Sequence, residues 1–378
     1  MELRYQVRTV DNLDAFRSIR HDWDILINNS GDYSFTQTYQ YCAMAAEHVF
    51  AGGGTVAVLL VYQDHQLMVL WPLAIHRKGP LRIARVLTCG TGDEYGGPLL
   101  HEAAGRPVIE RMLEAVTHLP AEVLQVQVRQ GTLLQQCLEA AQPRLLLWLL
   151  RGLGAATGYV IRLRDVPRWE DFLASLSSND RGNLRRRRRL LEARGQVEIG
   201  WCTTPGDAEA MLTWLFTTKR EWAEDRGIHT RYPLDDRIRD FFIALSRQLD
   251  LATTPFITFV KVDGMPVAAS LNLIGGHSLE GFVTTYDEAF ARYSVGTLLL
   301  EFLAHWAHAN GRDLDMRPAF GHYKSRWATH EEQYRTLFVF PSARGRLIRI
   351  PYVFFRVLKA LRGRINERKP ALRPAPAS

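Results

Sequence analysis

One succession of predicted elements occurs twice in this chain of 378 residues, and it constrains the fold more than any other feature. In its first occurrence, residues 55–62 and 66–75 are apolar and β-prone, and the polar residues between them indicate a hairpin. A third strand, a Gly-rich loop, a helix and a further strand are then expected over residues 82–88, 90–97, 107–118 and 122–128. Strands that alternate with a helix in this way indicate a mixed α/β domain.

The same order returns about 200 residues later, although the residues themselves barely match. Three strands joined by Asp-Gly and Gly-Gly turns, a helix and a short strand are expected over residues 255–262, 267–274, 279–286, 296–309 and 312–316. We therefore predict an α/β fold with mixed sheets, built from two similar domains in tandem. These domains are expected at residues 1–150 and 151–345, and a tail occupies residues 346–378.

The junction of the two domains contains a Gly-rich run that is similar to a dinucleotide-binding fingerprint. Gly152, Gly154 and Gly158 have the spacing G-x-G-x-x-x-G, and residues 159–163 indicate a strand where the fingerprint requires a helix. We interpret the run as a linker.

The formal net charge of +7 is unevenly distributed. From Arg344 to Ser378 there are ten basic residues and one acid, Glu367, so the body of the chain is close to neutral. The body is therefore not expected to be a generally basic surface that coats nucleic acid.

The expected location is the cytoplasm. The four cysteines are far apart in the sequence, which argues against a disulfide framework and a thiolate zinc site. His305 and His308 lie at i, i+3 on a predicted helix without a third ligand, so no metal is expected. The first residues lack the apolar stretch of a signal peptide, and the most apolar run, residues 145–150, is too short to span a membrane.

A loop over residues 290–297 leads directly into the helix expected from Gly296. The start of a helix offers unpaired N–H groups and a positive dipole end, which suit a phosphate or pyrophosphate. The candidate binding residues are Arg292, Ser294, Val295, Gly296 and Thr297. A plain strand-to-helix turn with Ser294 as N-cap is the alternative interpretation.

The segment 312–327 is the most informative part of the sequence. It begins as a strand that carries Asp315, breaks at Pro318 and continues as a predicted helix with Tyr323, Lys324 and Trp327. With the preceding loop and helix, this segment resembles the C-terminal half of the cellulose-biosynthesis-associated, Fem-like family of GNAT-superfamily acyltransferases. In that family a strand Asp is followed by a turn and a Tyr-Lys pair with a nearby aromatic residue.

The resemblance extends to other segments. Glu94 and Tyr95 resemble the Asp-Tyr loop of the family, with Glu in place of Asp, and residues 172–195 resemble the segment that opens its second domain. The turn over residues 319–321 departs from the pattern, since the family has Gly followed by acidic residues there. The resemblance implies two GNAT-like domains, an acyl-CoA or aminoacyl-tRNA donor, and transfer to an amine.

Acyl transfer from a thioester to an amine requires a base, a donor to the oxyanion and an acid for the leaving thiolate. We assign oxyanion stabilisation to Lys324, proton donation to Tyr323 or Tyr286, and the role of base to Glu94; Asp315 completes the candidate catalytic set. Each of these residues also has an ordinary structural interpretation, as a solvated, packing or capping residue.

The densest charge run is formed by the arginines at positions 181 and 185–189. If residues 183–193 are helical, Arg187 and Arg188 flank the buried stripe and can reach an anion in the interdomain cleft. A solvated basic helix is the alternative. Tyr95, Trp327, Arg187 and Arg188 are the candidate residues for binding substrate or anions.

The leading hypothesis is an N-acyltransferase that moves an acyl group, most simply acetyl, from acyl-CoA to an amine of a polysaccharide- or envelope-related substrate. The alternatives are a Fem-type aminoacyl-tRNA-dependent transferase, for which the near-neutral body is unfavourable, and a non-catalytic binding module of the same fold. No metal and, unless the donor is tRNA, no nucleic acid are expected.

The tail is predicted to be a basic amphipathic helix whose first turn contains Pro351. Apolar residues fall on one face, and basic residues on the other. The apolar face is expected to lie on an anionic membrane surface at the inner face of the cell membrane or to pack on the second domain. The positions after Lys369 are expected to be disordered.

Overall fold

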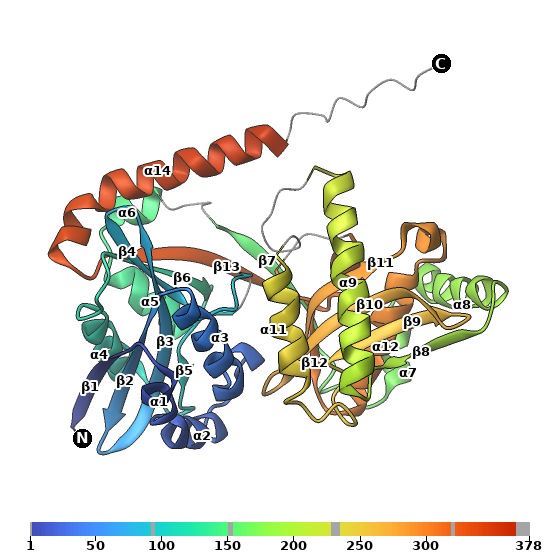
Figure 1. The fold of residues 1–378 in the computed structure, drawn as a ribbon, viewed down its shortest axis with the longest axis horizontal. Coiled ribbons are helices and arrows are strands. Elements are labelled where there is room, and N and C mark those ends of the chain that lie inside the picture. The colour runs from blue at the N-terminus through green and yellow to red at the C-terminus, as the bar shows by residue number, and fades with distance from the viewer. Residues whose placement is uncertain (1, 92–94, 150–153, 228–234, 319–321, 368–378) are drawn as a thin grey trace.

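The computed structural model describes residues 2–91, 95–149, 154–227, 235–318 and 322–367 (Figure 1). The elements of the first half are β1 (Leu3–Val10), α1 (Leu13–Arg17), α2 (Arg20–Asn28), α3 (Tyr39–Ala51), β2 (Thr55–Gln63), β3 (Gln66–Lys78), β4 (Leu81–Val86), β5 (Leu99–Leu100), α4 (Arg106–Val116), β6 (Val123–Arg129), α5 (Leu133–Ala140) and α6 (Arg144–Leu149).

The elements that follow are β7 (Ala156–Ile161), α7 (Trp169–Ser175), α8 (Ser178–Glu192), β8 (Val197–Trp201), α9 (Pro205–Asp225), α11 (Asp236–Ser246), β9 (Ile257–Val262), β10 (Met265–Ile274), β11 (Ser278–Tyr286), α12 (Val295–Ala309), β12 (Asp313–Asp315), α13 (His322–Trp327), β13 (His330–Val339) and α14 (Ala343–Glu367). A short 3-10 helix, Glu288–Tyr293, precedes α12. The described strands form one mixed sheet in the order β1-β2-β3-β4-β6-β13-β7-β12-β11-β10-β9-β8, with β5 paired to β3.

The predicted internal repeat is confirmed, and it is longer than the sequence indicated. The run β2-β3-β4-α4-β6 matches β9-β10-β11-α12-β12, and in both the last strand pairs in parallel with the third strand of the meander. The strands β1 and β8, which sequence analysis missed, extend the repeat because each pairs antiparallel with the first predicted strand of its half. The fold is therefore α/β with two tandem units of the same topology.

The two halves exchange their last strands. β7 follows the first half in the chain but pairs with β12 of the second, whereas β13 follows the second half but pairs with β6 of the first. β7 and β13 also pair with each other, from His330 opposite Val160 to Tyr334 opposite Ala156, which makes the sheet continuous. Sequence analysis did not expect a strand over 330–339.

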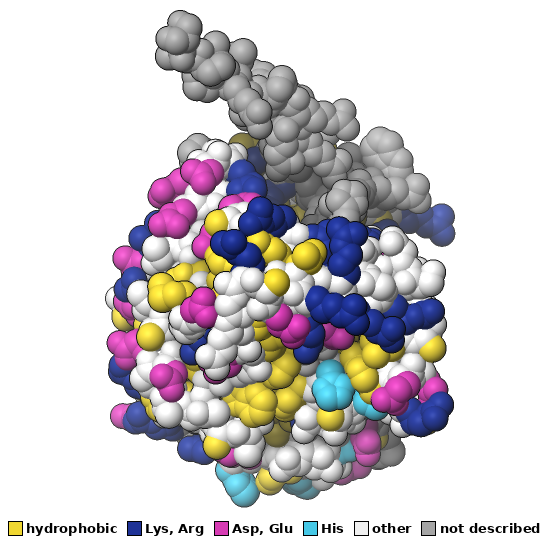
Figure 2. Space-filling view, turned by 90° about the vertical axis from the view of Figure 1, so that its right-hand side faces the viewer, with side chains coloured by type: hydrophobic (Ala, Val, Ile, Leu, Met, Phe, Trp, Pro, Cys, Tyr) yellow, Lys and Arg dark blue, Asp and Glu magenta, His cyan; other side chains and the backbone are white. Residues whose placement is uncertain are grey.

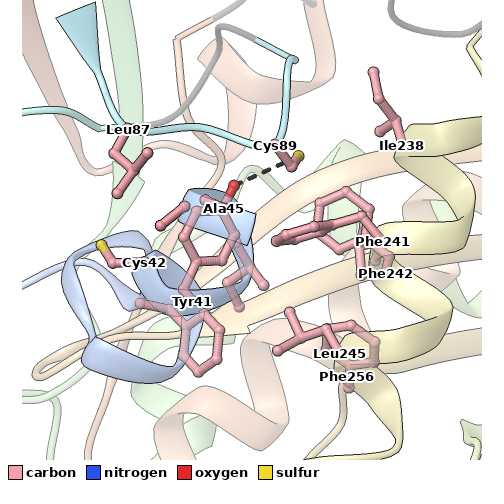
Figure 3. Close-up of a cluster of buried hydrophobic side chains, with 14 of the residues drawn as sticks. Tyr41, Cys42, Ala45, Leu87, Cys89, Ile238, Phe241, Phe242, Leu245 and Phe256 are labelled. Carbon is pink, nitrogen blue, oxygen red and sulfur yellow. Dashed lines mark hydrogen bonds between the residues drawn. The ribbon is translucent and has the colours of Figure 1, made fainter. Parts of the chain in front are cut away.

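A hydrophobic core joins the two halves on one side of the sheet. Helix α3 of the first half and helix α11 of the second face each other there, as Figure 3 shows. The Tyr41 ring lies edge-on to Phe241 with ring centroids 5.3 Å apart, and its hydroxyl group donates to the Sγ atom of Cys89. Tyr41, Cys89 and Phe242 are almost fully buried. These contacts hold the halves together as one packed body.

The tail differs from the prediction in two respects. Helix α14 begins at Ala343, so Pro351 lies inside the helix rather than in its first turn. The helix packs on strands of both predicted domains rather than on the second alone, because Val353 is fully buried against a cluster with Ile83 of β4 and Phe338 of β13. The predicted disordered end, after Lys369, lies outside the described residues.

Candidate active site

The strands β11 and β12 separate after a short parallel pairing. Only Ser278–Glu280 pair with Asp313–Asp315, and the pairing of β10 with β11 shifts register so that Phe282 has no partner residue on β10. Such a bulge bends the strand and releases backbone groups from the ladder. A cavity of about 590 Å³, called here the cofactor cavity, opens beside this bulge and reaches the start of α12.

The wall of the cofactor cavity at α12 contains four of the five predicted cofactor residues, Ser294, Val295, Gly296 and Thr297. Ser294 has left-handed backbone angles, φ 53° and ψ 42°, and its side chain does not cap the helix. The N–H groups of Thr297 and Leu298 return to the Ser294 carbonyl oxygen. The first N–H groups of α12 are thus not satisfied by an N-cap side chain, and they lie at a cavity of suitable size for a pyrophosphate.

Three predicted catalytic residues, Tyr286, Tyr323 and Lys324, also line the cofactor cavity. Local desolvation, followed by the neighbouring Tyr286, raises the pKa of Tyr323, which favours a protonated phenol. Burial lowers the pKa of Lys324 to about 8, although the negative charge of Asp315 partly opposes this. The Lys324 Nζ atom donates to the Met316 carbonyl oxygen at 2.6 Å, so the side chain is held in place.

Asp315 belongs to a buried polar network on the opposite side of β12. Its Oδ2 atom accepts from the Tyr95 hydroxyl group at 2.8 Å, and Oδ1 accepts from the backbone N–H of Arg317 at 2.7 Å. The Arg317 guanidinium donates to Glu280 at 2.6 Å and lies over the Tyr95 ring. Glu280 in turn accepts from the Ser34 hydroxyl group of the first half. Burial raises the pKa of both Asp315 and Glu280.

A second cavity of about 370 Å³, the inter-half cavity, lies against this network. Asp315, Glu280 and Tyr95 line it together with Tyr334 of β13, whose ring stacks on Tyr95. Asp315 lines the inter-half cavity, while its neighbours Leu314 and Met316 line the cofactor cavity. Since side chains alternate along a strand, β12 separates the two cavities.

The remaining predicted site residues lie elsewhere. Trp327 is buried in the core of the second half beside Phe172. Arg292 donates to the Tyr293 hydroxyl group at 2.6 Å. Arg187 and Arg188 lie on α8, which is at the outer end of the second half in Figure 1, and Arg188 pairs with Glu301 of α12.

Figure 2 faces the outer end of the second half and shows several Lys and Arg side chains on that face. Glu94, the expected base, lies outside the described residues.

Sequence analysis missed Lys219 and Trp222 of α9, as well as Glu280 and Arg317. Lys219 lines the cofactor cavity, donates to the Thr284 carbonyl oxygen and lies 4.1 Å from the Trp222 ring centroid. Nothing in the spacing of α9 marks Lys219. A signal for Arg317 was present, since an Arg two residues after a strand Asp can reach a neighbouring strand.

Within the described residues, no group of three or more His, Cys, Asp or Glu side chains is arranged to hold a metal ion. Nor is any helix there long and apolar enough to cross a membrane.

The second half contains a GNAT-type acetyltransferase domain, in which parallel strands separate at a bulge above a cavity that ends at a helix start. Residues 178–333 match the family described as "Acetyltransferase (GNAT) domain", and the matched range contains the whole lining of the cofactor cavity. No curated protein matches the chain.

Three solved structures are similar to the whole chain. FemX has a TM-score of 0.52 at 11% identity, and the match covers 93% of this chain and 99% of FemX. A conserved protein of unknown function from Bacteroides thetaiotaomicron has a TM-score of 0.52 at 13% identity, with 88% and 99% covered.

The third is the C-terminal domain of a putative lysylphosphatidylglycerol synthetase from Agrobacterium fabrum, which has a TM-score of 0.50 at 12% identity, with 86% and 92% covered. At these identities the likeness shows the fold alone. The comparisons support a GNAT-type acetyltransferase domain with a Fem-like fold; they do not confirm the cellulose-biosynthesis-associated family expected from the sequence.

Proposed function

We propose that the protein transfers an acyl group, most simply acetyl, from acyl-CoA to an amine. The observation that carries this proposal is the cofactor cavity, which joins a bulged strand to an uncapped helix start within the segment matched to GNAT acetyltransferases. The bulge supplies backbone groups for the acyl end of the donor, and the helix start supplies N–H groups for its pyrophosphate.

The reaction needs the amine nitrogen to attack the thioester carbonyl carbon. A proton leaves the amine, the C–S bond breaks, and the CoA thiolate takes up a proton. Tyr286 and Tyr323 line the cofactor cavity, and the raised pKa of Tyr323 keeps its phenol protonated as a donor to the thiolate. We assign stabilisation of the oxyanion to the charge of Lys324 together with the backbone at Phe282.

The amine is proposed to lie in the inter-half cavity and to reach the thioester where β11 and β12 separate, beyond Glu280 and Asp315. Asp315 lines the inter-half cavity beside this point and carries a raised pKa, so it is the described carboxylate best suited to accept the proton of the amine. Tyr95 orients this carboxylate through its hydroxyl group. An amine on a polysaccharide or envelope precursor is the acceptor class implied by the family resemblance.

An aminoacyl-tRNA donor is the second candidate, because FemX and the lysylphosphatidylglycerol synthetase domain share the fold. The near-neutral body of the chain is the observation against it, since docking of tRNA requires a large basic face.

Calorimetry on the full chain tests the proposal. We expect one acetyl-CoA to bind per chain and free CoA to appear when amino sugars are added. A chain that binds aminoacyl-tRNA but not acetyl-CoA would replace the acyl-CoA proposal with the second candidate. A chain that binds neither donor would make the fold a binding module.

A further inference from the structure

Helix α14 has two apolar sides, and only one of them is covered. On the covered side Val353 is fully buried, and Tyr352 and Val357 pack against the same cluster of the first half. On the other side Leu347, Ile350, Phe354 and Leu358 are exposed by 83%, 47%, 56% and 38%. Their spacing of three, four and four residues places them in one row along the helix, called here the α14 ridge.

The covered side fixes the orientation of the α14 ridge. Because Val353 and Val357 anchor the helix on the first half, the ridge cannot turn inward without removing these residues from their cluster. Phe355, which is 57% exposed, widens the apolar surface. Soluble proteins rarely expose a contiguous row of large apolar side chains unless it binds something.

Helix α14 is basic. The side chains described in it include Arg344, Arg346, Arg349, Arg356 and Lys359, and no acidic residue precedes Glu367. Of these, Arg356 lies over the Phe338 ring and so faces the first half. Among the described side chains, Arg346, Arg349 and Lys359 form no ion pair with a carboxylate.

Positive charge is also crowded beneath the helix. Partial desolvation, then the charges of Lys359 and Arg356, lower the pKa of Lys78 at the end of β3. Desolvation and the charge of Arg356 lower the pKa of Arg85 on β4 in the same way. Lys78, Arg85, Arg356 and Lys359 therefore repel one another, whereas Arg344 lies near the carboxylate of Glu122.

We propose that the α14 ridge binds the surface of an anionic lipid bilayer. Apolar side chains enter the boundary between headgroups and acyl chains, and the basic side chains of α14 other than Arg356 meet the anionic headgroups. A second copy of this chain is a poorer occupant, because a dimer formed through the ridge would bring two basic surfaces together. Helix α14 lies on the outside of the molecule, over the first half, as Figure 1 shows. A bilayer that approaches from this side would contact α14 before the other described helices of the first half.

Vesicle co-sedimentation of the full chain tests this proposal. Deletion of the helix is unsuitable because it would remove Val353 from the core. The apolar variant is Phe354→Asp/Leu358→Asp, and its control is Met265→Asp, which changes an exposed apolar residue in the β9–β10 turn. The charge variant is Arg346→Gln/Arg349→Gln, and its control is Arg185→Gln/Arg186→Gln on α8.

With vesicles of phosphatidylcholine that contain about 30% phosphatidylglycerol, we expect the unchanged chain and both controls to bind, and salt to weaken binding. The charge variant should bind roughly thirtyfold more weakly, since each basic residue near such a surface contributes about 1 kcal/mol. The apolar variant should not sediment with the vesicles, while its melting temperature stays unchanged.

Equal binding to pure phosphatidylcholine, or full binding by the folded apolar variant, would overturn the proposal. So would a dimer in light scattering without lipid that the apolar variant abolishes, because a second copy would then cover the ridge.

Discussion

The two halves of this protein share a topology but differ at one strand and one helix start. In the second half, β10 and β11 pair with a shift of register at Phe282, whereas in the first half the pairing of β3 with β4 is continuous. Helix α12 has Gly296 in its first turn, whereas α4 has Pro107, which has no N–H group. The same scaffold thus offers a bulged strand with a candidate anion site in one half and a continuous antiparallel pairing of β3 with β4 in the other.

This difference separates the elements that determine the architecture of each half from those that could bind a donor. The repeated meander and crossover helix determine the sheet. Both helix starts lack a capping side chain, so the bulge and the free N–H groups of α12 are what make one copy a candidate donor site. The first half contributes instead to the buried network, through Tyr95 and Ser34.

The largest expected effect comes from breaking the contact between the halves at Glu280. Glu280→Ala removes the buried carboxylate that pairs with the Arg317 guanidinium and accepts from the Ser34 hydroxyl group. We expect the free energy of unfolding to fall by about 3–5 kcal/mol, measured by urea denaturation. The double variant Glu280→Ala/Arg317→Met should recover part of this loss. No loss in the single variant would mean that the network does not couple the halves.

The next effect concerns the chemistry of the second half. Lys324→Met removes the charge beside the cofactor cavity, so kcat should fall roughly a hundredfold, with a smaller change in KM for acetyl-CoA. The control is Lys261→Met on β9, which should keep its activity. If Lys324→Met retains most of its turnover, the lysine only holds α13 to the Met316 carbonyl.

A smaller effect tests the two helix starts directly. Gly296→Val places a branched side chain near Tyr286 in the cofactor cavity, since even a Cβ atom there would lie 3.7 Å from the ring. We expect affinity for acetyl-CoA to fall by about 1–3 kcal/mol in calorimetry. Gly105→Val at the start of α4 is the matched control in the first half and should leave affinity unchanged. Equal losses in both variants would remove the distinction between the halves.

The smallest effect is a pH dependence. Burial lowers the pKa of Lys324 to about 8, so its charge is present below that pH and is lost above it. If the charged form is productive, turnover should fall roughly fourfold between pH 7 and pH 8.5. Lys324→Arg keeps the charge at both pH values and should remove this descending limb. If turnover of the arginine variant still falls over this pH range, another titrating group causes the fall.

Sequence patterns predicted the repeated part of this fold, because hairpin turns and apolar runs are local signals. The strands β7 and β13 show the limit of such signals. The strand of β7 was expected from residues 159–163, but its partner was not, and β13 was missed because His330–Gln333 are polar. Which strand completes which half is decided by contacts between distant residues.

The candidate site likewise contains residues that local sequence patterns could identify and residues that they could not. Gly296, Tyr323 and Lys324 line the same cavity. They lie within about 30 residues of one another in the sequence, so local patterns could identify them as one site. Trp327 shows the reverse, since an aromatic residue at a suitable spacing proved to be part of the core. Lys219 could not be found, because it reaches the cavity from α9, which precedes the repeated strands and carries no motif.

The exchange of β7 and β13 has a consequence for synthesis on the ribosome. Strand β6 at the edge of the first half acquires its neighbour only when residues 330–339 have been made, so its hydrogen-bonding groups stay open while the intervening 200 or so residues are translated. The first half cannot finish folding before the second, and contacts of such long sequence separation slow the final step. The two tandem units therefore complete their folding together rather than one after the other.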